Sequence, residues 1–171
     1  AGEWVADGQD SPSLDRAHPA QGYRYEIEPN GMRANQGAWG GTIFASRSSS
    51  ILSLQRPLVH QKVRVSTAIS WMADMNRWPS GGTVAIQASS DSGQNWFTLP
   101  SGSGLDPEES FYRWNTLQCT PGNQWRVRVI CEQHPEIVAE MPGDLIIGGM
   151  YFVNDADQQG DQWCTAAGSA E

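Results

Sequence analysis

Several stretches of the chain alternate hydrophobic and polar residues, which is the pattern of half-buried β-strands. The longest such stretch is residues 62–72, and three others are residues 23–29, 83–89 and 124–132. In these four stretches the side chains expected to face inward are, in chain order, Tyr23, Tyr25, Ile27, Val63, Val65, Thr67, Ile69, Trp71, Val84, Ile86, Ala88, Trp125, Val127, Val129 and Cys131. The pattern therefore predicts a protein built mainly from sheets.

Shorter apolar runs between turn residues predict further strands at residues 51–57, 96–99 and 111–119. The sequence TPGN at residues 120–123 is typical of a tight turn. We therefore expect the strands on either side of it, residues 111–119 and 124–132, to pair as a hairpin.

Residues 145–153 (LIIGGMYFV) are apolar on both faces, which predicts a central buried strand. Gly148 and Gly149 within it indicate a bulge or a close approach of another segment. No stretch sustains the period of 3.6 residues that marks a helix. About eight to ten strands separated by turns predict an all-β fold, a jelly roll or β-sandwich.

These strands fall within residues 21–155, which we expect to form a single domain. Residues 1–20 are polar and are interrupted by Pro12 and Pro19, so an irregular N-terminal arm is expected there. Residues 156–171 are polar and rich in small residues, and are expected to form a tail.

The chain is acidic, with a formal net charge of −8, and only one of its eleven basic residues is a lysine, Lys62. Nucleic acids and anionic membranes need basic surfaces, so neither is expected as a partner. No apolar run reaches the length of a membrane span, and membrane insertion is not expected. The first ten residues lack the basic start and apolar stretch of a signal peptide.

Cys119, Cys131 and Cys164 leave at least one cysteine unpaired, and their pairing is open. The absence of a CxxC spacing argues against a structural zinc site. Residues 155–161 resemble the start of an EF-hand loop, but Ala166 stands where the bidentate glutamate would be, which favours a solvated tail. No cofactor is expected, and calcium is the one cation that we keep for testing.

Ser89, Asp91, Gly93 and Trp96 have the spacing of an Asp-box, a short turn motif. The serine and aspartate side chains can accept hydrogen bonds from turn amides, and glycine can adopt a positive φ. The aromatic ring then folds back over the hairpin. These four residues are therefore expected to form a structural turn.

The order of the strands around this turn, from Gly37 to Asp155, resembles that of MAM domains and reelin subrepeats. Similar units occur in phage tail and virion surface proteins. The resemblance implies a jelly-roll binding or adhesion module, often stabilised by calcium. This chain departs from the pattern in its last strand, where Gly148 and Gly149 stand in place of a frequent acidic pair.

Catalytic motifs are not evident, because the sequence has no GxSxG, no HExxH and no phosphate-binding loop with its lysine. Asp106, Glu108 and Glu109 could in principle provide a glycosidase acid/base pair, but adjacent loop acids are more often exposed to solvent. A sialidase-type hydrolase would need a propeller, which one Asp-box cannot supply. We therefore expect no enzymatic activity.

Aromatic residues in or near predicted loops could stack on sugar rings. These candidates are Trp39, Trp78, Tyr112, Trp114 and Trp163, with Arg77, Asn35, Gln36 and Asn76 as polar partners. Trp78 is expected to be exposed, because Pro79 and the glycines after it prevent a strand. Packing within the protein or against another subunit is the alternative role for these rings.

The sequence thus predicts non-catalytic recognition or adhesion on a surface, extracellular or on a virion, with a glycan as the first ligand to test. The alternative is a structural component of an assembly, such as a phage decoration or tail protein. Identical or neighbouring subunits would then be the partners, and the arm would reach over them.

Overall fold

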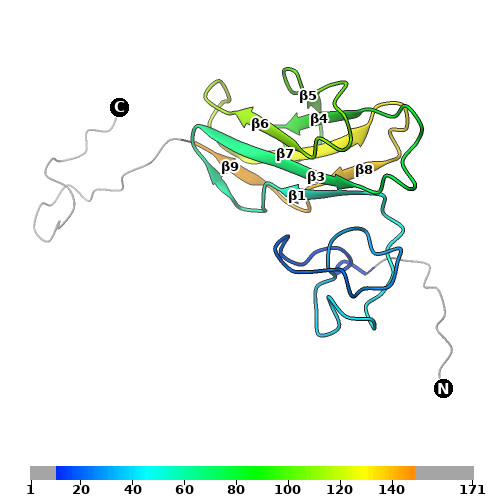
Figure 1. The fold of residues 1–171 in the computed structure, drawn as a ribbon. Helices are drawn as coiled ribbons and strands as arrows, with labels where there is room; N and C mark the ends of the chain where they lie inside the picture. The colour runs from blue at the N-terminus through cyan, green and yellow to red at the C-terminus, as the bar shows by residue number, and fades with distance from the viewer. Residues whose placement is uncertain (1–10, 149–171) are drawn as a thin grey trace, which may run out of the picture.

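The computed structural model describes residues 11–148, which form an irregular segment followed by nine strands (Figure 1). The strands are β1 (Leu52–Arg56), β2 (Lys62–Val63), β3 (Ser66–Ala73), β4 (Val84–Ser89), β5 (Phe97–Thr98), β6 (Phe111–Asn115), β7 (Gly122–Cys131), β8 (Val138–Glu140) and β9 (Leu145–Ile147). Residues 11–148 contain no helix. The predicted all-β fold class is confirmed.

The strands form two sheets, which is the arrangement of a β-sandwich (Figure 1). The smaller sheet has the order β1-β3-β6, and its pairs are antiparallel. The larger sheet has the order β2-β9-β7-β4-β5, and β8 also pairs with β7. The pairing of β2 with β9 is parallel, and the other pairs of this sheet are antiparallel. Jelly-roll connectivity stays a prediction.

The apolar core fills the space between the two sheets, because alternate residues of the long strands turn the same way. The smaller sheet contributes Leu52, Leu54, Ile69, Trp71 and Trp114, and the larger contributes Val84, Ile86, Ala88, Trp125, Val127, Val129, Leu145 and Ile147. The inward faces predicted for residues 83–89 and 124–132 are therefore correct.

Residues 11–51, called the N-terminal lobe below, are irregular apart from one isolated bridge, between Asn30 and Ser48, and pack beside β1 (Figure 1). Ser53 and Gln55, on the face of β1 turned away from the core, are buried by this lobe. The Gln55 amide donates to the carbonyl of Met32 at 3.3 Å, and Arg33 donates to that of Leu54 at 2.8 Å. The lobe thus covers an edge strand, which would otherwise present unpaired backbone groups.

The strand predicted at residues 23–29 is wrong. The chain turns there, with the Glu26 amide donating to the Tyr23 carbonyl at 2.9 Å, and at residues 25–27 the burial is the reverse of the prediction. Glu26 is 4% exposed, whereas Tyr25 and Ile27 are 76% and 46% exposed. Backbone donors from a distant loop satisfy one oxygen of the Glu26 carboxylate, and no local pattern reveals them.

The stretch at residues 62–72 is divided between the sheets, because β2 pairs with β9 and β3 pairs with β1 and β6. Val65 lies at the crossing and is 50% exposed, so its predicted inward position is wrong. Val63, Thr67, Ile69 and Trp71 are buried as expected.

The hairpin predicted at residues 120–123 is also wrong. β6 pairs with β3, whereas β7 pairs with β4, β8 and β9, so the turn carries the chain from one sheet to the other. A turn signal fixes a reversal of the chain but not the partner of each strand.

β9 lies between β2 and β7, as a central strand should, and Leu145 and Ile147 are buried. Among the described residues, a Cβ at Gly148 would meet Pro121 alone, at 3.9 Å, so no close approach of another segment is present there; the bulge stays a prediction. Gly149 and the rest of the predicted strand lie outside the described residues.

Candidate functional site

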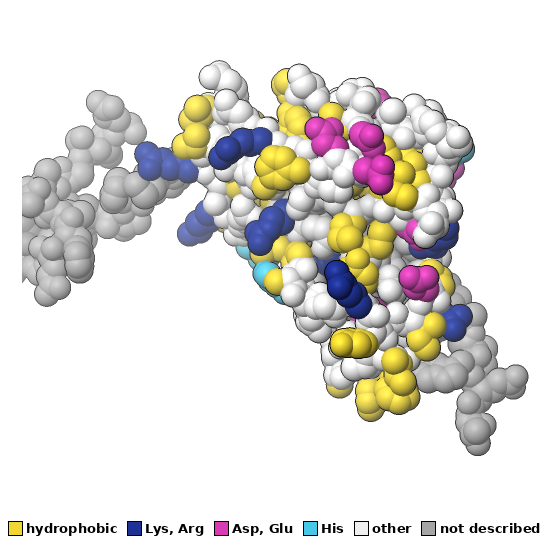
Figure 2. Space-filling view, viewed as in Figure 1, with side chains coloured by type: hydrophobic (Ala, Val, Ile, Leu, Met, Phe, Trp, Pro, Cys, Tyr) yellow, Lys and Arg dark blue, Asp and Glu magenta, His cyan; other side chains and the backbone are white. Residues whose placement is uncertain are grey.

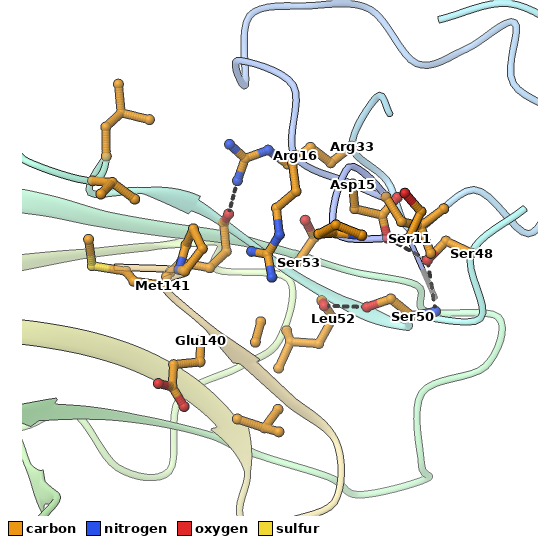
Figure 3. A pocket seen from close by; sticks show the side chains of 18 of the residues that line it. Ser11, Asp15, Arg16, Arg33, Ser48, Ser50, Leu52, Ser53, Glu140 and Met141 are labelled. Carbon is orange, nitrogen blue, oxygen red and sulfur yellow. Dashed lines mark hydrogen bonds between the residues drawn. The ribbon is translucent and has the colours of Figure 1, made fainter. Parts of the chain in front are cut away.

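A pocket of about 430 Å³ lies where the N-terminal lobe meets the sandwich (Figure 3). The lobe supplies the polar wall, which includes Asp15, Arg16, Arg33 and the hydroxyls of Ser11, Ser48, Ser49 and Ser50. The sandwich supplies an apolar floor, which includes Leu52, Leu54, Val59, Ala139 and Met141. The pocket therefore combines hydrogen-bond donors with an apolar surface, as binding sites for small molecules commonly do.

Arg33 joins the two parts of the molecule at this pocket. Its Nε donates to the Ala17 carbonyl at 2.7 Å, and its Nη1 donates to the Leu54 carbonyl of β1 at 2.8 Å. Burial lowers the pKa of the Arg33 guanidinium, and the charge of Arg16 lowers it further. Two guanidinium groups therefore lie close enough to repel each other.

The Arg16 side chain points from the lobe toward Ser53 and Met141 (Figure 3). Neither Arg16 nor Arg33 has a carboxylate oxygen within 4 Å among residues 11–148. Arg16 makes no side-chain hydrogen bond with these residues either, although it lines the pocket. The pocket thus presents guanidinium donors without a direct anionic partner from the described part of the chain.

Asp15 lies beside the arginines but is directed into the lobe. Its backbone amide donates to Asn35 Oδ1 at 2.8 Å, and its Oδ2 accepts a hydrogen bond from the Ser48 hydroxyl. Burial raises the pKa of the Asp15 carboxyl, and the hydrogen bond from Ser48 opposes this effect. Gly31, at φ 61°, packs against this carboxylate, and a Cβ there would overlap with it.

Trp39 lies in the lobe and is 63% exposed. The ring of Phe44, 57% exposed, meets it edge to face at a centroid distance of 5.5 Å. Glu26 Oε1 fixes this loop, because it accepts hydrogen bonds from the amides of Asn35 at 2.8 Å and Gly41 at 2.7 Å. The buried Glu26 carboxylate therefore fixes the loop that exposes this aromatic pair to solvent.

The lobe exposes three further apolar side chains besides this pair. Together the five are Tyr25, Ile27, Trp39, Ile43 and Phe44, called the apolar residues of the lobe below. Figure 2 shows hydrophobic side chains gathered on this end of the molecule. None of the five lines the pocket.

Trp78 is buried, so the prediction that it is exposed is wrong. Pro79 and the glycines do prevent a strand, but the loop folds back and packs the indole into the core. Its Nε1 donates to the Gly82 carbonyl at 3.0 Å. A Cβ at Gly82 would lie 2.8 Å from that nitrogen, so the missing side chain makes room for the ring.

Trp114 is 2% exposed on the inner face of β6, which removes it as a stacking residue. Tyr112 is partly exposed, its hydroxyl donates to the Pro100 carbonyl at 2.6 Å, and burial raises its pKa. Arg77 pairs with Asp74 at 2.6 Å and donates to the carbonyls of residues 49 and 50. The predicted ligand-binding residues are therefore not brought together in the pocket.

The turn at residues 89–96 is held by its own side chains. Ser89 Oγ donates to Asp91 Oδ1 at 2.7 Å and accepts from the Gly93 amide at 2.8 Å. The Asn95 amide donates to Asp91 Oδ1 at 2.9 Å. These hydrogen bonds, the one from Ser89 first, lower the pKa of Asp91 to about 2. Gly93 has φ 90°, and the Arg128 guanidinium lies 4.3 Å from the Trp96 ring centre.

The loop acids Asp106, Glu108 and Glu109 are exposed and do not line the pocket. Asp106 Oδ1 accepts a hydrogen bond from the Glu108 amide at 2.9 Å, as in a turn. Residues 11–148 contain no group of three or more histidine, cysteine, aspartate or glutamate side chains arranged around a metal. The acidic stretch at residues 155–161 and Trp163 lie outside the described residues.

Comparisons with protein-family models, with curated proteins and with solved structures find no match to this chain. The described residues contain no helix long and apolar enough to span a membrane. Cys119 and Cys131 are not joined to each other, and Cys164 lies outside the described residues.

Arg16, Arg33 and Glu26 are the residues that sequence reasoning missed. Arg16 stands in the stretch read as an irregular arm, and Arg33 in a loop without a motif. Glu26 falls on the outer face of the strand predicted at residues 23–29. No local signal distinguishes these three from ordinary surface charges.

Proposed function

We propose that this chain is a non-catalytic recognition module that binds an acidic glycan in the pocket between the lobe and the sandwich. The observation that carries the proposal is the pair Arg16 and Arg33, which line this pocket without a carboxylate within 4 Å among the described residues. Guanidinium groups bind carboxylate, sulfate and phosphate through paired hydrogen bonds.

The rest of the pocket suits a sugar. Serine hydroxyls donate to and accept from sugar hydroxyls. The apolar floor, with Leu52, Leu54 and Met141, can contact the apolar face of a pyranose ring. The volume of about 430 Å³ lies within the roughly 300–1,000 Å³ of ligand pockets, enough for one or two sugar units.

A binding role fits this pocket better than hydrolysis. The pocket-lining carboxylates are Asp15, which is bound to Ser48, and Glu140, which is paired with Arg126 at 3.3 Å. Glycosidases use two carboxylates that flank the scissile bond, one of them as a free acid. An extracellular or virion surface, where acidic glycans are met, is the location that this role implies.

The test is binding to arrayed glycans, followed by calorimetry with the best ligand. We expect sialylated, uronate or sulfated glycans to bind and neutral ones to bind weakly. Arg16→Ala should weaken binding at least about tenfold, because a hydrogen bond to a charged group contributes about 1.5–3 kcal/mol. Arg24→Ala, which removes an exposed arginine of the same lobe outside the pocket, serves as the matched control. Equal binding by both variants, or a silent array, would exclude the proposal.

The second candidate is a structural component of an assembly, such as a phage decoration or tail protein. The observation that favours it is the set of apolar residues of the lobe, which includes the aliphatic Ile27 and Ile43 at 46% and 59% exposure. Sugar sites rarely need exposed isoleucines, whereas contacts between subunits commonly bury them.

Light scattering separates the two candidates. An assembly component should form a defined oligomer that dissociates when Ile43→Asp places a charge among these residues. A chain that is monomeric at all concentrations and still binds acidic glycans would exclude the assembly role, so that the recognition module would be the remaining candidate.

A further inference from the structure

The interior of the N-terminal lobe holds two carboxylates with one free oxygen each. Glu26 is 4% exposed, and its Oε2 has no hydrogen-bond partner among the described residues. Asp15 is partly buried, and its Oδ1 likewise has no partner there. A buried carboxylate oxygen without a partner is unfavourable, so something outside the described protein atoms is expected to meet it.

Asn35 connects the two carboxylates. Its backbone amide donates to Glu26 Oε1 at 2.8 Å, and its side-chain oxygen accepts from the Asp15 amide at 2.8 Å. Ser48, fully buried, donates its hydroxyl to Asp15 Oδ2 (Figure 3). Burial raises the pKa of the Asp15 carboxyl, and the charge of Glu26 raises it further. The two carboxylates therefore lie in the same part of the lobe, close enough to repel each other.

No basic side chain of the described residues balances this charge directly. The positive charges of Arg16 and Arg33 reach Asp15 at longer range, but neither arginine forms an ion pair with it within 4 Å. Arg33 instead donates to the carbonyls of Ala17 and Leu54. Buried carboxylates are stabilised by hydrogen bonds, an ion pair, a bound cation or a proton, and the two free oxygens have neither a hydrogen bond nor an ion pair among the described residues.

We propose that Asp15 and Glu26 bind a divalent cation through their free oxygens, and that calcium is the ion that fits best. Calcium takes six to eight oxygen ligands in flexible geometry and accepts carboxylates, carbonyls, hydroxyls and water. Irregular loops such as those of the lobe can supply such a set, whereas magnesium requires a near-ideal octahedron. Asp15 also lines the pocket, but the cation site is argued from the free oxygens in the lobe and does not depend on the acidic-glycan proposal.

The cation would link segments of the lobe that are not joined to each other by strand pairing. Asp15 is tied to Ser48 and Asn35, and Glu26 is tied to Asn35 and Gly41. One ion at the two carboxylates would therefore connect the loop that contains Asp15, the turn that contains Glu26 and the loop that carries Trp39. Calcium binding is expected to stabilise the lobe more than the sandwich.

The experiment uses the full chain, freed of metal with EDTA and then titrated with calcium chloride by calorimetry and by thermal unfolding. We expect one-to-one binding, with magnesium weaker by at least tenfold. At calcium concentrations about 100-fold above Kd, the Tm should rise by roughly 5–10 °C. Glu26→Gln and Asp15→Asn should each abolish this rise. Glu109→Gln, which changes an exposed loop acid, should keep it.

Three results would overturn the proposal. The first is the absence of calcium binding to the wild-type chain, which would mean that the two carboxyls share a proton. The second is calcium binding that survives in folded Glu26→Gln and Asp15→Asn, as judged by circular dichroism. The third is binding lost only with Asp157→Asn, which would place the ion in the C-terminal acidic stretch. Because the wild-type titration stands alone, the test remains decisive even if one variant does not fold.

Discussion

The indole rings of Trp114 and Trp125 meet edge to face across the sandwich, with their centroids 5.6 Å apart. Trp114 belongs to β6 of the smaller sheet and Trp125 to β7 of the larger one, and they are 2% and 5% exposed. The short turn between these strands therefore does not pair them but places one ring from each sheet in the same core.

The first prediction follows from this contact. Trp114→Ala should lower the free energy of unfolding by about 3–5 kcal/mol, because it removes a large buried ring and leaves a cavity. Trp39→Ala should change it by less than about 0.5 kcal/mol, since that ring is 63% exposed. Urea denaturation followed by circular dichroism measures both. Similar losses for the two variants would contradict the assignment of one ring to the core and the other to the surface.

The sequence predicted the strands of the sandwich better than their partners. Alternation located Val84, Ile86 and Ala88 correctly, because both long strands of the larger sheet have one face toward the core. It could not show that residues 120–123 cross between sheets, since strand pairing depends on contacts that are distant in sequence. The predicted inward position of Val65 is wrong for the same reason, because the hydrophobic pattern does not show that the chain changes sheet at that residue.

The candidate site was less predictable than the fold. Trp78 was the ring predicted to be exposed, but it is buried because Gly82 leaves room for it, whereas Trp39 in a comparable loop is exposed. Glu26 is buried because amides 9 and 15 residues later in the chain donate to it. Such non-local donors satisfy one carboxylate oxygen of a residue that local reasoning assigns to the surface.

A second prediction concerns the turn at residues 89–96. Ser89→Ala should lower the free energy of unfolding by about 1–3 kcal/mol, because it leaves the partly buried Gly93 amide without its acceptor. Ser90→Ala, at the exposed neighbouring position, is the matched control and should have little effect. Chemical denaturation of the two variants gives the comparison. Equal stability would show that the Ser89 hydroxyl is not needed to close the turn.

The third prediction is the pH dependence that Asp91 confers. Its pKa is about 2 in the folded chain, below the ordinary value of 3.8 for an aspartate side chain. The folded state therefore favours the ionised form, so this contribution to stability is complete above about pH 4 and is lost as the pH falls toward 2. NMR titration of the Asp91 carboxyl measures its pKa directly. Ser89→Ala should raise this pKa, because it removes the hydrogen bond from Ser89, which lowers the pKa most. An Asp91 pKa near 3.8 in the wild-type chain would refute this.

A fourth prediction concerns the attachment of the lobe to the sandwich. Arg33→Ala should lower stability by about 1.5–3 kcal/mol, because its guanidinium donates to carbonyls on both sides of the junction. It should also make residues 11–51 more sensitive to limited proteolysis than the sandwich. Arg16→Ala should leave both properties nearly unchanged, since Arg16 makes no hydrogen bond with the described residues. Equal protease sensitivity of the two variants would mean that Arg33 does not hold the lobe in place.

The fifth prediction separates two effects of adding a methyl group to glycine. Gly31 and Gly81 both have a positive φ, at 61° and 74°. A Cβ at Gly81 meets nothing within 4 Å, whereas one at Gly31 would overlap with the Asp15 carboxylate. Gly81→Ala should therefore lower the free energy of unfolding by about 1–2 kcal/mol from the left-handed conformation alone.

Gly31→Ala should lower it by more, because the Asp15 carboxylate must move and lose its hydrogen bond from Ser48. Denaturation of both variants in EDTA excludes any contribution from bound calcium. Equal losses would mean that Asp15 can leave its position without penalty, and the close packing of Gly31 against its carboxylate would then have no structural role.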